Sequence, residues 1–199
     1  LEHAPIDYVK WDMNRSICDV YSRQFAGDRT GEVYHRFVLG VYELMERLTQ
    51  KYPHVLWEGC SGGGGRFDAG ILSYMPQIWC SDNTDAVERI HIQYGTSFGY
   101  PACAVGSHVS ASPNQQTGRE TPLQTRADVA LAGCFGYELD VRMLSGEEKA
   151  QIRRQIEDYW KLWHVIQQGD YYRLSNPQEN ADFTAWEFVA KDQKEAVVN

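Results

Sequence analysis

A chain of 199 residues can form one domain with a sizeable core, and its 43% hydrophobic and 23% charged residues are typical of soluble globular proteins. The formal net charge of −8 argues against nucleic acids and anionic membranes as partners, because both favour a basic surface. The apolar runs are too short for a membrane span, and the five cysteines are scattered, which is typical of reduced thiols in a cytosolic protein.

The first part of the chain alternates strand and helix signals. Residues 5–12 predict a strand, and residues 32–51 predict a helix that Pro53 ends. Short apolar strands are expected at 55–57 and 78–80, on either side of a Gly-rich run. The predicted helix has apolar residues along one face at spacings of three and four: Val33, Phe37, Val41, Leu44, Met45 and Leu48.

The alternation continues in the middle of the chain. A helix is expected over 86–94 and a strand over 101–109. Thr121 followed by Pro122 predicts an N-cap and a first helical residue, opening a helix that extends to about residue 132.

A short strand at 135–139 precedes the longest predicted helix. Ser145 and Glu148 have the spacing of a capping box, and Gly169 is the expected end of this helix. Its inward residues are expected to be Ile152, Ile156, Tyr159, Trp160, Trp163 and Ile166.

Repeated strand–helix units predict an α/β fold with a parallel sheet covered by helices. About five units are present, whereas a closed (β/α)8 TIM barrel needs eight, so we expect residues 1–169 to be the later part of such a barrel. Residues 170–199 contain two β-rich runs around the polar turn KDQK, which predicts the start of an antiparallel domain.

Two of the predicted strands end in an aspartate, Asp12 in DYVKWDMNR and Asp82 in WCSDNTDA. Residues two apart share one face of a strand, so Tyr8, Lys10 and Asp12 are expected to point together toward the barrel interior. A lysine that close favours the charged carboxylate, which suits Asp12 to act as a nucleophile at neutral pH. The alternative is that Asp12 only caps the turn that follows its strand.

Asp82 is a candidate general acid and base. The charge of a nearby Asp12 would favour the protonated form of Asp82, and esterification of Asp12 by a sugar would then let Asp82 act as a base. A carboxylate pair of this kind is what retaining hydrolysis of a glycosidic bond requires. Asp85 competes for the role, although its position suits the first turn of the next helix.

The Gly-rich turn CSGGGGRFD lies between the two aspartates in the sequence and allows the backbone to approach a ligand closely. A phosphate loop is excluded because no Lys-Ser/Thr pair follows the glycines. The six histidines lack ligand spacing, so no metal site is expected. A nucleophilic Cys60 would need a histidine partner, and none is evident near it.

Four ordered segments, KWDMNR, CSGGGGRFD, WCSDNTDA and AVGSHVSASPNQQTGR, together resemble the family 36 glycoside hydrolases, the bacterial α-galactosidases. The resemblance extends over essentially the whole chain. It implies a (β/α)8 barrel, of which this chain carries roughly strands four to eight, and then the start of a C-terminal β-sandwich. It also implies retaining hydrolysis of terminal α-D-galactosyl residues, as in melibiose and raffinose, without a cofactor and in the bacterial cytoplasm.

The same resemblance implies roles for individual residues. The aspartate of the KWDMN motif, Asp12, is expected to be the nucleophile, and the first aspartate of SDNTD, Asp82, the general acid/base. Lys10, Cys60 and Gly62 are expected to contact sugar hydroxyls. Asn14 and Arg66 are expected to line the same pocket.

Two departures from the family pattern leave other interpretations open. Relatives often carry PNHQ where this chain has PNQQ at 113–116, which alters a loop near the pocket mouth. The family's N-terminal β domain and early barrel strands are not found in this sequence, so the chain could be a non-catalytic galactoside-binding or assembly fragment. A third interpretation is galactosyl transfer to sugar acceptors. We expect the parent enzyme to be a homo-oligomer that binds a small galactoside, and neither nucleic acid nor membrane.

Overall fold

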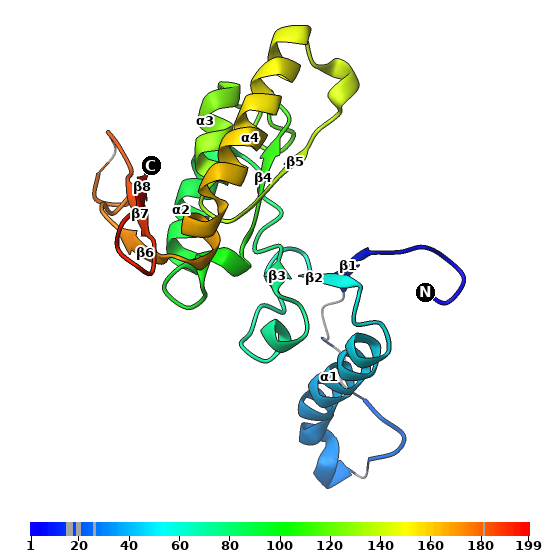
Figure 1. The fold of residues 1–199 in the computed structure, drawn as a ribbon. Helices are drawn as coiled ribbons and strands as arrows, with labels where there is room; N and C mark the ends of the chain where they lie inside the picture. The colour runs from blue at the N-terminus through cyan, green and yellow to red at the C-terminus, as the bar shows by residue number, and fades with distance from the viewer. Residues whose placement is uncertain (15–17, 19–20, 26, 181) are drawn as a thin grey trace. The chain divides into compact units, whose positions relative to one another are not determined.

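In a computed structural model, the chain is described at residues 1–14, 18, 21–25, 27–180 and 182–199. Arg15, the last residue of the first aspartate segment, lies outside these described residues. The chain divides into two compact units, Leu1–Ile78 and Trp79–Asn199, which are coloured from blue to cyan and from green to red in Figure 1. Helices and strands alternate along the chain, so the mixed α/β class predicted from the sequence is confirmed.

The first unit contains a three-stranded parallel sheet in the order β1-β2-β3. Its strands and helices are β1 (Tyr8–Asp12), a 3-10 turn η1 (Gly27–Glu32), α1 (Val33–Lys51), β2 (Leu56–Cys60), a second 3-10 turn η2 (Ile71–Ser73) and β3 (Gln77–Ile78). The register of β1 on β2 places Lys10 opposite Glu58 and Asp12 opposite Cys60. Asp12 and Cys60 are therefore paired at the carboxyl ends of neighbouring strands, and Lys10 and Glu58 are paired two residues earlier.

Strand β1 has two faces of different character, as its period-2 pattern predicts. Val9 and Trp11 pack against the core of the first unit, while Tyr8, Lys10 and Asp12 are exposed on the other face. The buried residues of this core are Met45, Val55, Trp57, Ile71, Met75 and Ile78.

The predicted apolar face of α1 is buried only in part. Met45 has no exposed area, and Val41 and Leu48 pack against the core beside it. Phe37 and Leu44, by contrast, are 40% and 43% exposed. The helical pattern is therefore confirmed, but the sheet of this unit covers only the central stripe of the helix.

The second unit contains the parallel strand pair β4–β5, with α3 packed on both strands and α2 packed on α3 (Figure 1). Its core joins Val109 of β4 to Leu123, Ala127 and Ala130 of α3. The elements of this part are α2 (Ala86–Thr96), η3 (Ala102–Ala104), β4 (Gly106–Ser110), α3 (Leu123–Ala130), β5 (Cys134–Glu138) and η4 (Val141–Met143).

The long helix α4 (Gly146–Gln168) begins as the sequence predicts. The Ser145 hydroxyl accepts a hydrogen bond from the Glu148 N–H at 3.1 Å, and the Glu148 carboxylate accepts one from the Ser145 N–H at 2.8 Å. Tyr159 and Ile166 are buried as expected, but Trp160 is 67% exposed, so its predicted inward position was wrong. Ile156 and Trp163, also predicted to face inward, are each 37% exposed. Adjacent residues of a helix point about 100° apart, and the surface that covers α4 reaches Tyr159 but not Trp160.

The last segment is a three-stranded antiparallel sheet of β6 (Asp170–Arg173), β7 (Trp186–Val189) and β8 (Ala196–Val198). The polar turn KDQK joins β7 to β8, as predicted. Phe188 of β7 is buried in a core that includes Tyr159 and Ile166 of α4. This core ties the antiparallel sheet to the long helix within the second unit.

Three local predictions differ from the structure. The strand expected at 78–80 is formed only at Gln77–Ile78, and the one expected at 101–109 starts as the turn η3 and becomes extended at Gly106. The residue before α3 is Pro122, which has an extended backbone and makes no side-chain cap, so Thr121 is not the N-cap. Among the described helices, none combines the length and apolarity needed to cross a bilayer.

Candidate active site

Asp12 is the last residue of β1, and its side chain is exposed. The Asn14 amide donates a hydrogen bond to Oδ2 of Asp12 at 2.8 Å. The Asn14 carbonyl oxygen in turn accepts a hydrogen bond from the N–H of Gly62. Asn14 therefore links the carboxylate at the end of β1 to the Gly-rich turn that follows β2, and one oxygen of Asp12 is held while its side chain remains accessible.

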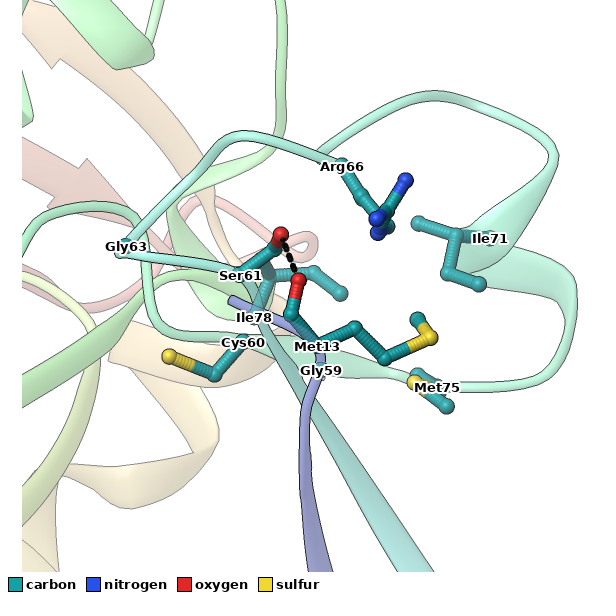
Figure 2. Close-up of a pocket in the computed structure, with 9 residues that line it drawn as sticks. All are labelled: Met13, Gly59, Cys60, Ser61, Gly63, Arg66, Ile71, Met75 and Ile78. Carbon is teal, nitrogen blue, oxygen red and sulfur yellow. Dashed lines mark hydrogen bonds between the residues drawn. The ribbon is translucent and has the colours of Figure 1, made fainter. Parts of the chain in front are cut away.

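The Gly-rich turn is folded tightly at the end of β2. The Ser61 N–H donates to the Gly63 carbonyl at 2.8 Å, and the Ser61 hydroxyl donates to the Met13 carbonyl, as Figure 2 shows. Gly62 and Gly63 have φ values of +54° and +79°, a region that favours glycine. The glycine run that the sequence singled out is therefore needed for the turn itself.

Cys60 lies beside Asp12 in the parallel register of β1 and β2. Burial raises the pKa of the Cys60 thiol, and the Asp12 carboxylate, which accepts a hydrogen bond from it, raises that pKa further. The thiol points away from the side chains of Met13 and Arg66 (Figure 2). It is therefore protonated at neutral pH and acts as a weak hydrogen-bond donor rather than as a nucleophile.

Glu58 is the buried partner of Lys10 and was not predicted. Its side chain is 2% exposed, its Oε1 lies 3.5 Å from Nζ of Lys10, and its Oε2 accepts a hydrogen bond from the Tyr8 hydroxyl. Glu58 comes two residues before Cys60, so the two share one face of β2, and the register of β1 on β2 aligns that face with the face of Lys10 and Asp12. A carboxylate held this way fixes the ammonium group of Lys10 two residues before Asp12.

Arg66 lies on the helix side of the turn. Its guanidinium carbon is 5.5 Å from the centre of the Phe37 ring on α1. Arg66 also lines a small cavity together with Cys60 and Ser61 (Figure 2). Its predicted contact with a sugar stays a prediction.

Asp82 belongs to the second unit, where it lies between β3 and α2 in the chain. Its Oδ1 accepts a hydrogen bond from the indole N–H of Trp79 at 3.1 Å. The Gln116 amide donates to the Asp82 carbonyl at 2.7 Å and accepts from the Thr84 N–H at 3.0 Å. Both the side chain and the backbone of Asp82 are therefore held in place, and neither Trp79 nor Gln116 carried a signal in the sequence that marked it for this task.

Asp85 is the N-cap of α2, as its position predicts. Its carboxylate accepts hydrogen bonds from the N–H groups of Val87 and Glu88, at 2.8 and 3.2 Å, and from Thr117 and Arg119. Burial alone would raise the pKa of Asp85, but the hydrogen bonds from Thr117, Glu88, Arg119 and Val87 together hold that pKa below its ordinary value of 3.8. Its oxygens are occupied by structural contacts, which leaves Asp82 as the carboxylate of this segment suited to acid–base work.

The predicted residues thus fall into two groups. The first unit brings together Lys10, Asp12, Asn14, Cys60 and Gly62, and the second unit holds Asp82. Within the described residues, no cluster of three or more His, Cys, Asp or Glu side chains could hold a metal ion. Held carboxylates next to hydrogen-bond donors can attack, protonate or deprotonate a polar substrate.

Comparison with known proteins finds relatives that are named alpha-galactosidases and that match this chain over its whole length. The family model described as Melibiase matches residues 1–169. Alpha-galactosidase 1 of Pediococcus pentosaceus is 57% identical over 198 residues, which are 100% of this chain and 27% of that protein. The crystal structure of the GH36 alpha-galactosidase AgaA from Geobacillus stearothermophilus superposes with a TM-score of 0.96 at 51% identity, covering 100% of this chain and 27% of that one.

A second solved structure agrees with the first. The galactosidase domain of the alpha-galactosidase–sucrose kinase AgaSK has a TM-score of 0.92 at 56% identity, and the match covers 99% of this chain and 26% of that chain. The corresponding bifunctional protein of Mediterraneibacter gnavus is 56% identical over 199 residues. The chain therefore spans 20–27% of the length of the relatives that it matches.

Proposed function

The chain belongs to the Melibiase family, and from this membership we propose that it carries the two catalytic aspartates of a retaining α-galactosidase. The substrates proposed are terminal α-D-galactosyl residues of oligosaccharides such as melibiose and raffinose. Because the chain spans 27% of the length of Alpha-galactosidase 1, the activity proposed is that of the full-length protein. Oligomeric assembly and a cytoplasmic location of that protein are part of the same proposal.

The observation that carries this proposal is the group of side chains around Asp12. Asn14 holds one carboxylate oxygen of Asp12 at 2.8 Å, and the buried Glu58 holds Lys10 on the same strand face. The protonated thiol of Cys60 lies beside Asp12 in the register of the sheet. A carboxylate fixed by donors, with a cation and a further donor next to it, suits a nucleophile that attacks a sugar ring while its neighbours bind hydroxyl groups.

The proposed reaction has two steps. Asp12 attacks the anomeric carbon while Asp82 donates a proton to the departing glycosidic oxygen, which forms a galactosyl ester and releases the leaving sugar. Asp82, now a carboxylate, removes a proton from a water molecule that attacks the ester, so that galactose is released and both aspartates return to their first state.

Two crystal structures of relatives support this assignment of the aspartates. AgaA was crystallised with raffinose in a variant that includes an Asp→Asn substitution, and with stachyose in a variant that includes an Asp→Ala substitution. The two replaced aspartates are separated in their sequence by the same interval that separates Asp12 from Asp82 in this chain. A further AgaA structure contains 1-deoxygalactonojirimycin.

The finer architecture is proposed on the same grounds. Residues 1–169 are proposed to supply the later strands of a (β/α)8 barrel, with Asp12 and Asp82 at carboxyl ends of its strands, where barrel enzymes place their catalytic groups. Residues 170–199 are proposed to begin a C-terminal β-sandwich. The parallel pairings β1–β2 and β4–β5 and the antiparallel sheet β6–β8 support this division.

The test is made in the full-length protein with 4-nitrophenyl α-galactoside and with raffinose. Asp12→Ala is expected to abolish turnover of both, because the galactosyl ester cannot form. Asp82→Ala is expected to keep measurable activity on the nitrophenyl substrate in the presence of azide, because the small anion attacks the ester without a general base. Asp7→Ala is the matched control, since Asp7 is an exposed aspartate just before β1.

The outcomes separate the alternatives. Wild-type turnover in Asp12→Ala would contradict the nucleophile assignment. An inactive wild-type protein that still binds galactose would favour the non-catalytic fragment, and a product in which galactose is joined to a second sugar would favour transfer. No rescue of Asp82→Ala by any small anion would count against its role as acid and base.

A further inference from the structure

Trp79 comes three residues before Asp82 and makes the hydrogen bond to its carboxylate. The indole N–H donates to Oδ1 of Asp82 at 3.1 Å, and Trp79 is 4% exposed. We propose that Trp79 is a positioning residue that decides which oxygen of Asp82 delivers the proton to the departing sugar. The inference rests on the proposed α-galactosidase function and deepens it by one residue.

The chemistry of the indole group determines where the proton of Asp82 can lie. An indole N–H is a donor and cannot accept a hydrogen bond. The carbonyl oxygen of a protonated carboxyl group is the better acceptor, so Oδ1, which faces Trp79, is expected to stay unprotonated when Asp82 carries a proton. The proton is then carried by Oδ2, and rotation of the carboxyl group that would exchange the two oxygens loses the bond to Trp79. One indole thus selects both the orientation of the acid and the oxygen that donates.

The Trp79 ring is itself held from two elements. The ring of His108 on β4 stacks on it, with 4.7 Å between the centres and 22° between the planes, and Glu138 on β5 lies 3.1 Å from Nδ1 of His108. The guanidinium carbon of Arg89 on α2 is 4.8 Å from the centre of the indole. A histidine, a glutamate and an arginine from three different elements thus surround the indole within the second unit.

Arg89 is fixed as firmly as the ring that it contacts. It is 3% exposed, and its three nitrogens donate to the side chain of Gln93 and to the carbonyls of Ser81 and Gly106. The added Cβ of an alanine at Gly136 would lie 3.1 Å from the His108 ring, so glycine there leaves the space that His108 occupies. Arg89 and His108, which contact the Trp79 ring, are therefore themselves held by hydrogen bonds. A residue that only filled space would not need neighbours fixed in this way.

The test compares two buried tryptophans in the full-length protein. Trp79→Phe removes the N–H that faces Asp82. Trp186→Phe is the matched control, because Trp186 is 8% exposed and its indole nitrogen has no hydrogen-bond partner among the described residues. For each variant, kcat/KM is measured with raffinose and with 4-nitrophenyl α-galactoside, because this ratio follows the step in which the leaving group departs.

The two substrates differ in how much they need the acid. A sugar leaves only when its oxygen is protonated, whereas nitrophenolate leaves with little help. Trp79→Phe is expected to lower kcat/KM for raffinose roughly 10- to 100-fold and that for the nitrophenyl substrate less than about 3-fold, the size of one charge-assisted hydrogen bond.

A second replacement at position 79 distinguishes loss of the hydrogen bond from a change in packing. Benzothienylalanine at position 79 keeps the shape of the ring but has sulfur in place of the N–H, and it is expected to behave like Trp79→Phe. Equal losses on both substrates would overturn the inference even in an active enzyme. An inactive wild-type protein would instead overturn the proposed function on which it rests.

Discussion

Replacing Asp85 by alanine or asparagine separates the structural aspartate of the second unit from the proposed acid, Asp82. Asp85→Ala removes the cap of α2 and leaves Arg119 without its carboxylate partner. Asp85→Asn keeps an oxygen that can accept from the first N–H groups of the helix, but it loses the negative charge. The pair of variants thus separates the cap from the ion pair.

The magnitude follows from the contacts of Asp85. An Asp N-cap replaced by alanine costs about 1–2 kcal/mol, and a hydrogen bond to a charged group contributes about 1.5–3 kcal/mol. The total for Asp85→Ala is about 2.5–5 kcal/mol, which overlaps the range of about 3–5 kcal/mol for breaking a buried ion pair. The Asp85 side chain is 0% exposed but that of Arg119 is 39% exposed, so water can solvate the released cation and the loss lies near the lower end. Asp85→Asn is expected to cost about 1.5–3 kcal/mol, since only the charge is lost.

The pH dependence has a definite sign. The pKa of Asp85 is held below its ordinary value of 3.8 in the folded protein, so its stabilising effect is complete above that value and is lost as pH falls through the lower, folded pKa. The difference in unfolding free energy between wild type and Asp85→Asn should be constant from about pH 5 to 8 and shrink below about pH 4. Urea unfolding of the full-length protein at several pH values measures it, and hydrogen exchange of the Val87 and Glu88 amides reports the helix end directly.

A difference between wild type and Asp85→Asn that stays the same down to about pH 3 would refute this account, because the charge of Asp85 would then contribute nothing. Wild-type exchange rates of the Val87 and Glu88 amides in Asp85→Ala would refute the capping role. Turnover per folded molecule should survive in Asp85→Asn. Loss of turnover with unchanged stability would make Asp85, rather than Asp82, the acid.

Two further predictions concern local backbone structure. Gly63→Ala places a side chain at a φ of +79° and should lower stability by about 1–2 kcal/mol in thermal unfolding, whereas Gly99→Ala, whose added Cβ meets no atom within 4 Å, should not. Ser145→Ala should cost about 1 kcal/mol and speed hydrogen exchange in the first turn of α4, because the capping box with Glu148 is lost. Unchanged exchange there would show that the cap contributes nothing.

Features set by neighbouring residues were predicted correctly from the sequence. The alternation of β1 placed Val9 and Trp11 on one face and Lys10 and Asp12 on the other, because a strand has a period of two. The capping box at Ser145 was predicted because its two partners are three residues apart and need no other element. The prediction that Trp160 faces inward was wrong, because a helical pattern shows which residues are apolar but not how wide a surface covers them.

Features that depend on packing between distant segments were not predicted. Glu58 contacts Lys10 because of the register of β2 on β1, and no local sequence pattern predicts which residues of two strands align. The Trp79 ring is positioned by contacts with His108 on β4 and Arg89 on α2. The aspartates themselves could be found because they end predicted strands, whereas the side chains that hold them come from elsewhere in the chain.

The contacts of Gln116 have a consequence for the loop that carries them. Its side-chain amide offers one donor to the Asp82 carbonyl and one acceptor to the Thr84 N–H, which is the pair of groups that a neighbouring strand would offer. The Gln116 side chain thus makes the two hydrogen bonds that a neighbouring strand would make with this segment. The backbone conformation of the Asp82 segment therefore depends on the loop at 112–119. Any insertion or deletion in that loop would therefore be transmitted to the proposed acid, which lies 34 residues before Gln116, even though the aspartate segment itself was left unaltered.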